Sequence, residues 1–311
     1  MADLELTAMP HEDIRIGTIV GAGPDIASYL RQVIPHGFES FEITFGDKLG
    51  DRDPRKLAEQ VKRALDETPS SNGTPPVISA IGLYGNPLEH AQTAKDWETL
   101  IDACRLFGEA CTVVSGFTGC LSGKPVPDAM PRFKEVFTPL ATRAEDAGVR
   151  IAFENCDMGG RWECAYHNIA HAPAAWEMMF DAVPSPSLGL EWEPCHQMCS
   201  LVDPLPQLRQ WVKKIYHLHG KDATVDWPTL RTRGSKGGAR YAFHRHPGFG
   251  DSNWTDIISI LRLGGFHGAI DIEGWHDPVY KGDLEMTGQV HALHYLRRCR
   301  GGDFVPNPSQ A

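Results

Sequence analysis

The chain has 311 residues, of which 41% are hydrophobic and 23% are charged, a composition typical of a soluble globular protein. Its formal net charge of −10 argues against a nucleic-acid-binding surface, which needs clustered Lys and Arg side chains. No apolar run reaches the ~20 residues that span a bilayer, and the first residues do not read as a secretory signal, so we expect a cytoplasmic protein with no membrane partner.

Strand-like and helix-like segments alternate from one end of the chain to the other. The strand-like segments are short and mostly apolar, and lie at 14–21, 38–45, 76–84, 111–117, 149–155, 187–193, 215–220 and 268–274. Helices are predicted between them, at about 25–33, 54–67, 95–110, 133–147, 172–182, 205–213 and 253–263, with a closing helix to about 298.

Eight βα units therefore follow one another without a break in composition. Near-continuous apolar strands separated by helices indicate a parallel sheet that is covered on its outside. The count of eight predicts an α/β fold, a closed (β/α)8 TIM barrel, as a single domain over residues 1–311. An open doubly wound sheet is the alternative, but IVGAGPDIA has GxG without the third Gly of the phosphate-binding motif.

A long insertion at about 224–252 follows the seventh strand. It contains the basic stretch RTRGSKGGAR and then FHRHPGFGD, where His244, Arg245 and His246 precede a Pro-Gly-Phe-Gly turn. Because the insertion starts at the C-terminal end of a strand, where TIM barrels hold their active sites, we expect it to close part of the site, with Arg245 reaching the substrate. For RTRGSKGGAR, a solvated surface loop is the alternative.

The eight cysteines show neither a CxxC pair nor the spacing of a small disulfide-bonded domain. Most lie in apolar contexts, as Cys104 and Cys111 do, and are typical of reduced core residues. Cys195 and Cys199 flank His196, so a Cys/His zinc site is an alternative at this point. No second Cys pair completes the usual four ligands of such a site.

Four strand ends carry residues of a metal-binding type. Glu154 ends VRIAFEN, Glu193 ends SLGLEWE, His219 lies in KIYHLHGKD and Glu273 ends GAIDIEG. In a barrel of parallel strands the C-terminal ends converge on one mouth. Three carboxylates and one imidazole that meet there would form a site for a divalent cation, and a set rich in carboxylates suits a hard or borderline cation.

The order of motifs resembles one known superfamily. FEN, an acid-Pro-x-His segment, HxHxKD, PGxGD-x-x-W and a strand that ends in IE occur in the order seen in the xylose-isomerase-like sugar phosphate isomerase/epimerase superfamily. The resemblance runs through the last four strands, about half of the chain. In the first half, GLYGNPL is similar to the third-strand loop of that superfamily.

The resemblance implies one divalent metal ion, Mn²⁺, Mg²⁺, Co²⁺ or Zn²⁺, held by Glu154, Glu193, His219 and Glu273. The superfamily usually has Asp where this chain has Glu193. Glu191, two residues earlier on the same face of the strand, is the competing ligand.

The same resemblance assigns roles around the metal. Glu154 and Glu273 would be the paired catalytic acid and base. The candidates for contact with substrate are His196, His217, Lys221, Arg245, His246, Trp275 and His90. An Arg side chain suits a carboxylate, a phosphate or a pair of hydroxyls because its donors form a planar fork.

These roles predict a metal-dependent isomerase or epimerase of a sugar or sugar-like keto compound, which removes a proton beside a metal-bound carbonyl and forms an enediolate. A metal-dependent lyase or dehydratase on a keto-sugar or keto-glycoside is the alternative, since it uses the same first step. A non-catalytic sugar-binding barrel and a DNA-repair endonuclease are further alternatives. The expected partner is a small sugar-like molecule, and a homo-oligomer is left open.

Overall fold

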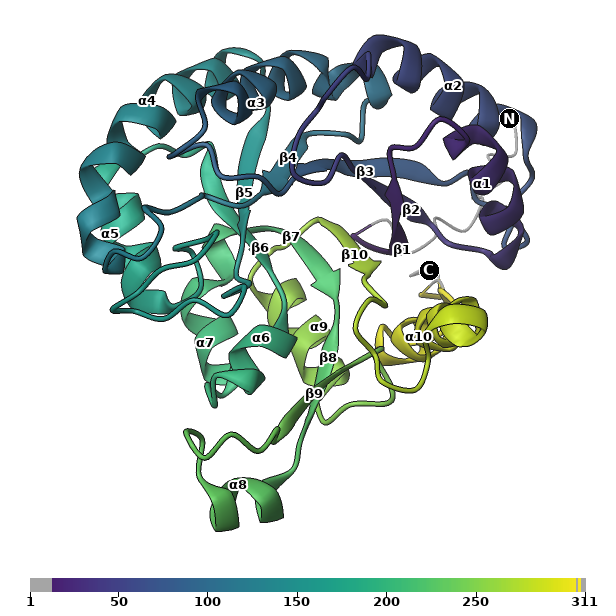
Figure 1. Cartoon of the computed structure of the whole chain (residues 1–311). Coiled ribbons are helices and arrows are strands. Elements are labelled where there is room, and N and C mark those ends of the chain that lie inside the picture. The colour runs from purple at the N-terminus through teal and green to yellow at the C-terminus, as the bar shows by residue number, and fades with distance from the viewer. Residues whose placement is uncertain (1–12, 306, 309–311) are drawn as a thin grey trace.

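A computed structural model describes residues 13–305 and 307–308, and in it eight parallel strands close into a barrel surrounded by helices (Figure 1). The strands are β1 (Ile14–Gly21), β2 (Ser40–Thr44), β3 (Val77–Leu83), β4 (Val113–Gly116), β5 (Arg150–Glu154), β6 (Leu188–Trp192), β7 (Ile215–Gly220) and β10 (Gly268–Ile272). Their order around the barrel is β1-β10-β7-β6-β5-β4-β3-β2. The predicted fold class is confirmed.

The structure describes ten helices, and all but α8, which buries no residue, pack an apolar face against the rest of the chain. They are α1 (Ile26–Val33), α2 (Pro54–Glu67), α3 (Ala91–Ala103), α4 (Met130–Asp146), α5 (Pro173–Ala182), α6 (Pro194–Cys199), α7 (Pro204–Trp211), α8 (Trp227–Arg233), α9 (Trp254–Leu263) and α10 (Glu285–Cys299). Short 3₁₀ turns lie at Ile34–His36, Cys104–Phe107, Val126–Ala129, Val212–Lys214 and Gly282–Leu284. Among the described residues, no helix has the length and apolar character that crossing a membrane requires.

Local sequence explains where these helices begin and which face they bury. Helix α2 starts after Asp53, whose carboxylate accepts hydrogen bonds from the backbone N–H groups of Arg55 and Lys56, with Pro54 at the first helical position. In α4, Phe133 and Phe137 face inward and their rings pack against each other at 4.8 Å between centroids. Phe153 of β5 lies against both rings, so this contact fixes the helix on the barrel.

The N-terminal end of the barrel is closed by a buried ion pair. Glu39, just before β2, accepts hydrogen bonds from Arg300 at 2.5 and 2.8 Å and from the backbone N–H of Ile16 at 2.9 Å. Arg300 also donates to the carbonyl of Ile14. The residue after α10 is thereby tied to the first two strands, and the carboxylate is fully paired.

The interior of the barrel is unusually polar. Asp271 of β10 accepts hydrogen bonds from Ser40 of β2 and Ser79 of β3, and one of its oxygens lies 2.8 Å from Nε2 of His217 on β7. These contacts cross the barrel, so they exist only because the sheet closes. Buried polar groups of this kind keep their hydrogen-bonding needs satisfied inside the fold.

The insertion after β7 is an ordered arm rather than a plain loop. β8 (Asp222–Val225) and β9 (Ala242–Arg245) pair antiparallel, and α8 lies between them at the far end of the arm (Figure 1). Short helix α6 packs against both strands. The stretch 231–240 is almost entirely exposed, in accord with the alternative of a solvated segment for RTRGSKGGAR.

Candidate active site

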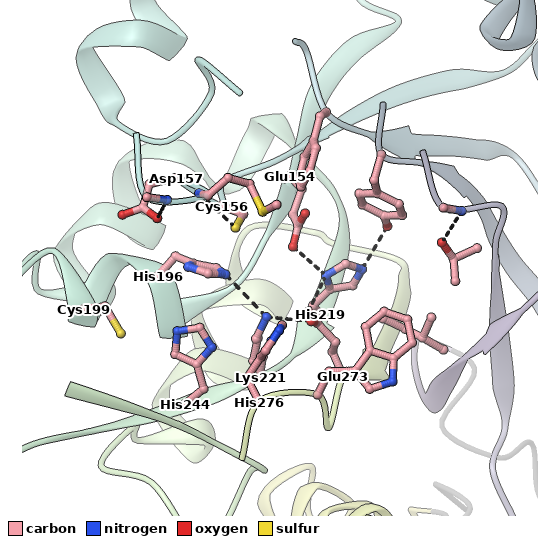
Figure 2. A pocket seen from close by; sticks show the side chains of 18 of the residues that line it. Glu154, Cys156, Asp157, His196, Cys199, His219, Lys221, His244, Glu273 and His276 are labelled. Carbon is pink, nitrogen blue, oxygen red and sulfur yellow. Dashed lines mark hydrogen bonds and ion pairs between the residues drawn. The ribbon is translucent and has the colours of Figure 1, made fainter. Parts of the chain in front are cut away.

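A cavity of about 530 Å³ opens at the C-terminal ends of the barrel strands. It is bounded by strand ends on one side and by β9 and the segment after β10 on the other (Figure 2). The residues that line it are Ile19, Thr44, Gly46, Asp47, Tyr84, Phe117, Glu154, Cys156, Asp157, Met158, Gly159, His196, Cys199, His219, Lys221, Arg240, His244, Glu273, Trp275 and His276. The position is the one at which TIM barrels hold active sites.

The structure brings the four predicted metal ligands together. Glu154 ends β5, Glu193 directly follows β6, His219 lies on β7 and Glu273 directly follows β10. One ligand atom from each lies within 4.8 Å of the others, and all four side chains are buried. Three of them, Glu154, His219 and Glu273, face one another in Figure 2.

Several atoms of this group make no hydrogen bond, although ionisable side chains lie close to them. Both carboxylate oxygens of Glu193, Nδ1 of His219 and Oε2 of Glu273 are buried and make no hydrogen bond with any described residue. Buried groups left in this state cost about 1–3 kcal/mol each, and more when charged. Three carboxylates and one imidazole are a donor set that a hard or borderline divalent cation would satisfy.

A second layer of carboxylates orients the His219 ring. Nε2 lies 2.9 Å from Glu42 and 3.2 Å from Glu191, whereas Nδ1 lies 3.4 Å from Glu154 and 3.2 Å from Glu273. The interior carboxylates therefore occupy one nitrogen and leave the other facing the cavity. Metal-ligating histidines are typically held in this way, by a carboxylate on the second ring nitrogen.

Glu191 and Glu193 lie in different environments. Glu191 faces the barrel interior, where one oxygen is 2.9 Å from Nδ1 of His217 and the other lies 2.9 Å from the Tyr84 hydroxyl. Burial alone would raise the pKa of Glu191, but the neighbouring His219 and His217 lower it to about 2. Glu193 makes no hydrogen bond, its near neighbours are His196 and Lys221, and its carboxylate lies with Glu154, His219 and Glu273, so the geometry favours Glu193 as the ligand.

Glu154 and Glu273 differ in charge balance. The Lys221 ammonium lies 2.6 Å from Glu273, and together with His219 it outweighs burial and lowers the pKa of Glu273 below its usual range. At Glu154 burial dominates and raises the pKa to about 7, although His219 is 3.4 Å away. Two carboxylates whose environments push their pKa values apart are typical of an acid and a base.

The predicted substrate-binding residues separate into two groups. His196, Lys221 and Trp275 line the cavity. Nε2 of His196 lies 2.7 Å from Glu193 and 3.4 Å from Nζ of Lys221.

The other four lie outside the lining, and this placement does not support contact with substrate. His217 is enclosed in the barrel interior between Glu191 and Asp271. Arg245 and His246 both contact Asp277, at 3.2 and 3.3 Å. His90 is exposed just before α3.

Some cavity residues were not anticipated as site residues. Arg240 ends the stretch expected to be solvated or part of a lid, and His276 comes three residues after Glu273. Tyr84 lies in GLYGNPL, the one first-half motif that resembled the superfamily, and its hydroxyl donates to Glu42 at 2.6 Å. That motif was the available signal for Tyr84, whereas Arg240 enters the site only through the fold of the arm.

Comparison with known proteins places the chain in a family. Residues 30–299 match the model of the xylose isomerase-like TIM barrel, and the chain belongs to that family. The match includes most of the first four βα units, where motifs had shown little, and the suspected superfamily is confirmed. A search of curated proteins found no match.

Solved structures of similar shape include enzymes that act on sugars. D-psicose 3-epimerase in the presence of D-fructose superposes with a TM-score of 0.67 at 17% identity, covering 93% of this chain and 100% of the other. 3-keto-D-glucoside 4-epimerase from E. coli superposes with a TM-score of 0.64 at 18% identity, covering 92% of this chain and 100% of the other. The IolI protein with a bound zinc atom superposes with a TM-score of 0.62 at 17% identity, covering 92% of this chain and 96% of the other. At these identities the likeness establishes the shared fold.

Proposed function

We propose that this protein is a metal-dependent isomerase or epimerase of a sugar or sugar-like keto compound. The observation that carries the proposal is the group of four buried side chains at the barrel mouth, several of whose atoms make no hydrogen bond with the described residues. Family membership supports an enzyme, and the sugar epimerases among the similar structures support the substrate class.

Glu154, Glu193, His219 and Glu273 are the proposed ligands of one divalent cation. Such a cation would polarise the carbonyl of a bound substrate and make the neighbouring carbon easier to deprotonate. Glu42 and Glu191 would hold His219 so that Nδ1 faces the cation. The cation would also balance the excess of negative charge that the three carboxylates bring to one buried point.

The two catalytic carboxylates have separate tasks. Glu273 is kept ionised by Lys221, so it is ready to accept a proton from the carbon next to the carbonyl. Glu154, whose pKa burial raises to about 7 before a cation binds, would return the proton. Return of the proton from the opposite side of the substrate would invert the carbon, and return to the neighbouring carbon would shift the carbonyl.

The remaining cavity residues would orient the substrate. His196 and Lys221 can donate hydrogen bonds to its oxygens, and Arg240 can do so from the arm. Trp275 provides a partly exposed aromatic face at the rim, suited to the apolar side of a sugar. A cavity of about 530 Å³ admits a small sugar-like molecule.

The test combines metal binding with proton exchange. The purified chain would be stripped with a chelator, reloaded with Mn²⁺, Co²⁺, Mg²⁺ or Zn²⁺, and incubated with a panel of keto-sugars in D₂O. We expect metal-dependent uptake of deuterium next to the carbonyl of at least one substrate. Product analysis then separates isomerisation from loss of a β-substituent, which would indicate the lyase alternative.

The test variant is Glu193→Gln, which keeps the size of a side chain that makes no hydrogen bond with the described residues. We expect this variant to stay folded, to lose the metal held by Glu154, His219 and Glu273, and to take up no deuterium. If the variant binds metal there as the parent does, the ligand assignment is wrong. If the loaded parent exchanges no proton with any keto-sugar, the proposed reaction is wrong.

A further inference from the structure

Three side chains with ligand atoms lie together at the edge of the cavity. They are separate from the carboxylate group, by which we mean the four proposed ligands Glu154, Glu193, His219 and Glu273. The three are Cys195 and Cys199 of α6 and His244 of β9, and one ligand atom from each lies within 4.8 Å of the others. Cys195 is buried and the other two are half-buried. Figure 2 shows the Cys199 thiol beside the His244 ring, on the side away from His219.

Local structure explains why the two thiols face the same way. Cys195 and Cys199 are four residues apart in α6, a spacing that places side chains on the same face of a helix. That face is turned toward β8 and β9, against which α6 packs. The antiparallel pairing of the arm then brings His244 to the thiols, since Ala223 of β8 pairs with His244 of β9.

The chemistry of this cluster differs from that of the carboxylate group. Two thiols and an imidazole favour a thiophilic cation such as Zn²⁺, whereas three carboxylates and an imidazole favour a harder one. The thiolate is the form that binds metals.

We propose that Cys195, Cys199 and His244 form a second metal site, which binds a thiophilic divalent cation and ties the β8–β9 arm to α6 at the rim of the cavity. Two ligands come from the barrel side and one from the arm, so the cation would link them directly. Cys199 and His244 also line the cavity, which leaves room for a water or a substrate atom as a fourth ligand. The site is independent of the proposed reaction.

The test uses Co²⁺ as a spectroscopic probe on the full chain, stripped of metal under reducing conditions. Cobalt bound to a thiolate absorbs in the near ultraviolet through charge transfer, whereas cobalt bound only to carboxylates and imidazole does not. We expect the parent to bind two equivalents, one of which produces this band. Cys199→Ser and His244→Asn should each weaken or lose the equivalent that carries the band.

Two control variants locate the signal. Glu193→Gln should lose the other equivalent and keep the band. The second control is Cys156→Ser, because Cys156 lies with Glu154 and His196 in another group of ligand atoms within 4.8 Å. Cobalt bound there could produce a thiolate band of its own. The band should survive in this variant.

Hydrogen exchange provides a second readout that does not depend on absorption. If a cation ties the arm to α6, the amides of β8 and β9 should exchange more slowly when Zn²⁺ is added to the parent, and this protection should be absent in Cys199→Ser. The proposal is overturned if the parent shows no thiolate band, if the band persists in Cys199→Ser, if it disappears in Cys156→Ser, or if mass analysis finds Cys195 and Cys199 joined in a disulfide that resists reduction.

Discussion

The two ends of the barrel treat buried charge in opposite ways. At the N-terminal end the carboxylate of Glu39 has a cation and a backbone donor within hydrogen-bonding distance. At the C-terminal end the carboxylate of Glu193 is at least as deeply buried, yet neither oxygen has a hydrogen-bond partner among the described residues. A buried charge is tolerated only when something compensates it. The first end has its compensation inside the fold, whereas at the second the Lys221 ammonium is 3.9 Å from Glu193 and we propose that a metal ion completes the compensation.

The difference separates stability from function within one architecture. Residues that close the N-terminal end contribute to folding, and residues at the C-terminal end, where barrels of this type hold their active sites, are the ones that we propose carry chemistry. The interior layer formed by Glu42, Glu191, His217 and Asp271 lies between them and is internally paired. Variants at each level should therefore change different measured quantities.

The largest effect is expected at the C-terminal end. Glu273→Gln keeps the shape of the side chain but removes both a base and a ligand charge, so turnover should fall by about 10²–10⁴-fold or more. The circular dichroism spectrum should stay that of the parent. Glu59→Gln, on the exposed face of α2, is the matched control and should retain full turnover. Near-parental turnover in folded Glu273→Gln would remove it from the catalytic pair.

The next effect is expected at the N-terminal end. Arg300→Met leaves Glu39 buried without its cation and should lower the free energy of unfolding by about 3–5 kcal/mol. Chemical denaturation measures this loss, while turnover per folded molecule should remain. Arg31→Met is the control, because its ion pair with Glu67 at 2.8 Å is exposed and should contribute at most about 1 kcal/mol. Equal losses in both variants would contradict the assigned role of Arg300.

A smaller effect is expected from the interior layer. Glu42→Gln weakens the hold on Nε2 of His219 and should reduce metal affinity about 10–100-fold, since outer-shell partners have effects of this size. Competition with a chelating dye measures the affinity. Ser115→Ala removes one donor to Glu42 but keeps its carboxylate, and should change affinity much less. Parental affinity in Glu42→Gln would show that Glu42 does not orient the ligand.

The smallest effect is expected at Arg245. The sequence suggested that this side chain reaches the substrate, but its Nε lies 3.2 Å from Asp277 and the residue is outside the cavity lining. Arg245→Lys should therefore leave kcat and KM near the parental values, with only a slight loss of stability. Steady-state kinetics tests this, with the keto-sugar that the deuterium-exchange experiment identifies as the substrate. A large rise in KM would return Arg245 to the set of substrate-binding residues.

Short and closely packed elements escaped sequence-based prediction. The helix predicted at 54–67 coincides with α2, because Asp53, Pro54 and a regular apolar face mark it locally. Helix α6 was missed, since six residues are too few to show a helical period. The arm was expected as a loop, because strands of four residues acquire their identity from pairing with each other.

The partner of the Cys195 and Cys199 pair illustrates the same limit. In the sequence His196 stands between them and is the natural third ligand. In the structure the His196 ring is next to Glu193 and Lys221, and the nearby imidazole is that of His244, which a folded arm brings back from far along the chain. Proximity in sequence was misleading because successive helical residues point in different directions.

By itself, the sequence determined the barrel and the residue types at its mouth, because periodic apolar strands and their polar ends are local features. Only the tertiary structure decided which of these residues meet. Closure of the sheet sets Glu42 against His219, pairs Glu191 with His217 and leaves Glu193 without a hydrogen bond to any described residue. The physical reason is that whether a buried polar atom is satisfied depends on its neighbours in space, and these come from distant strands.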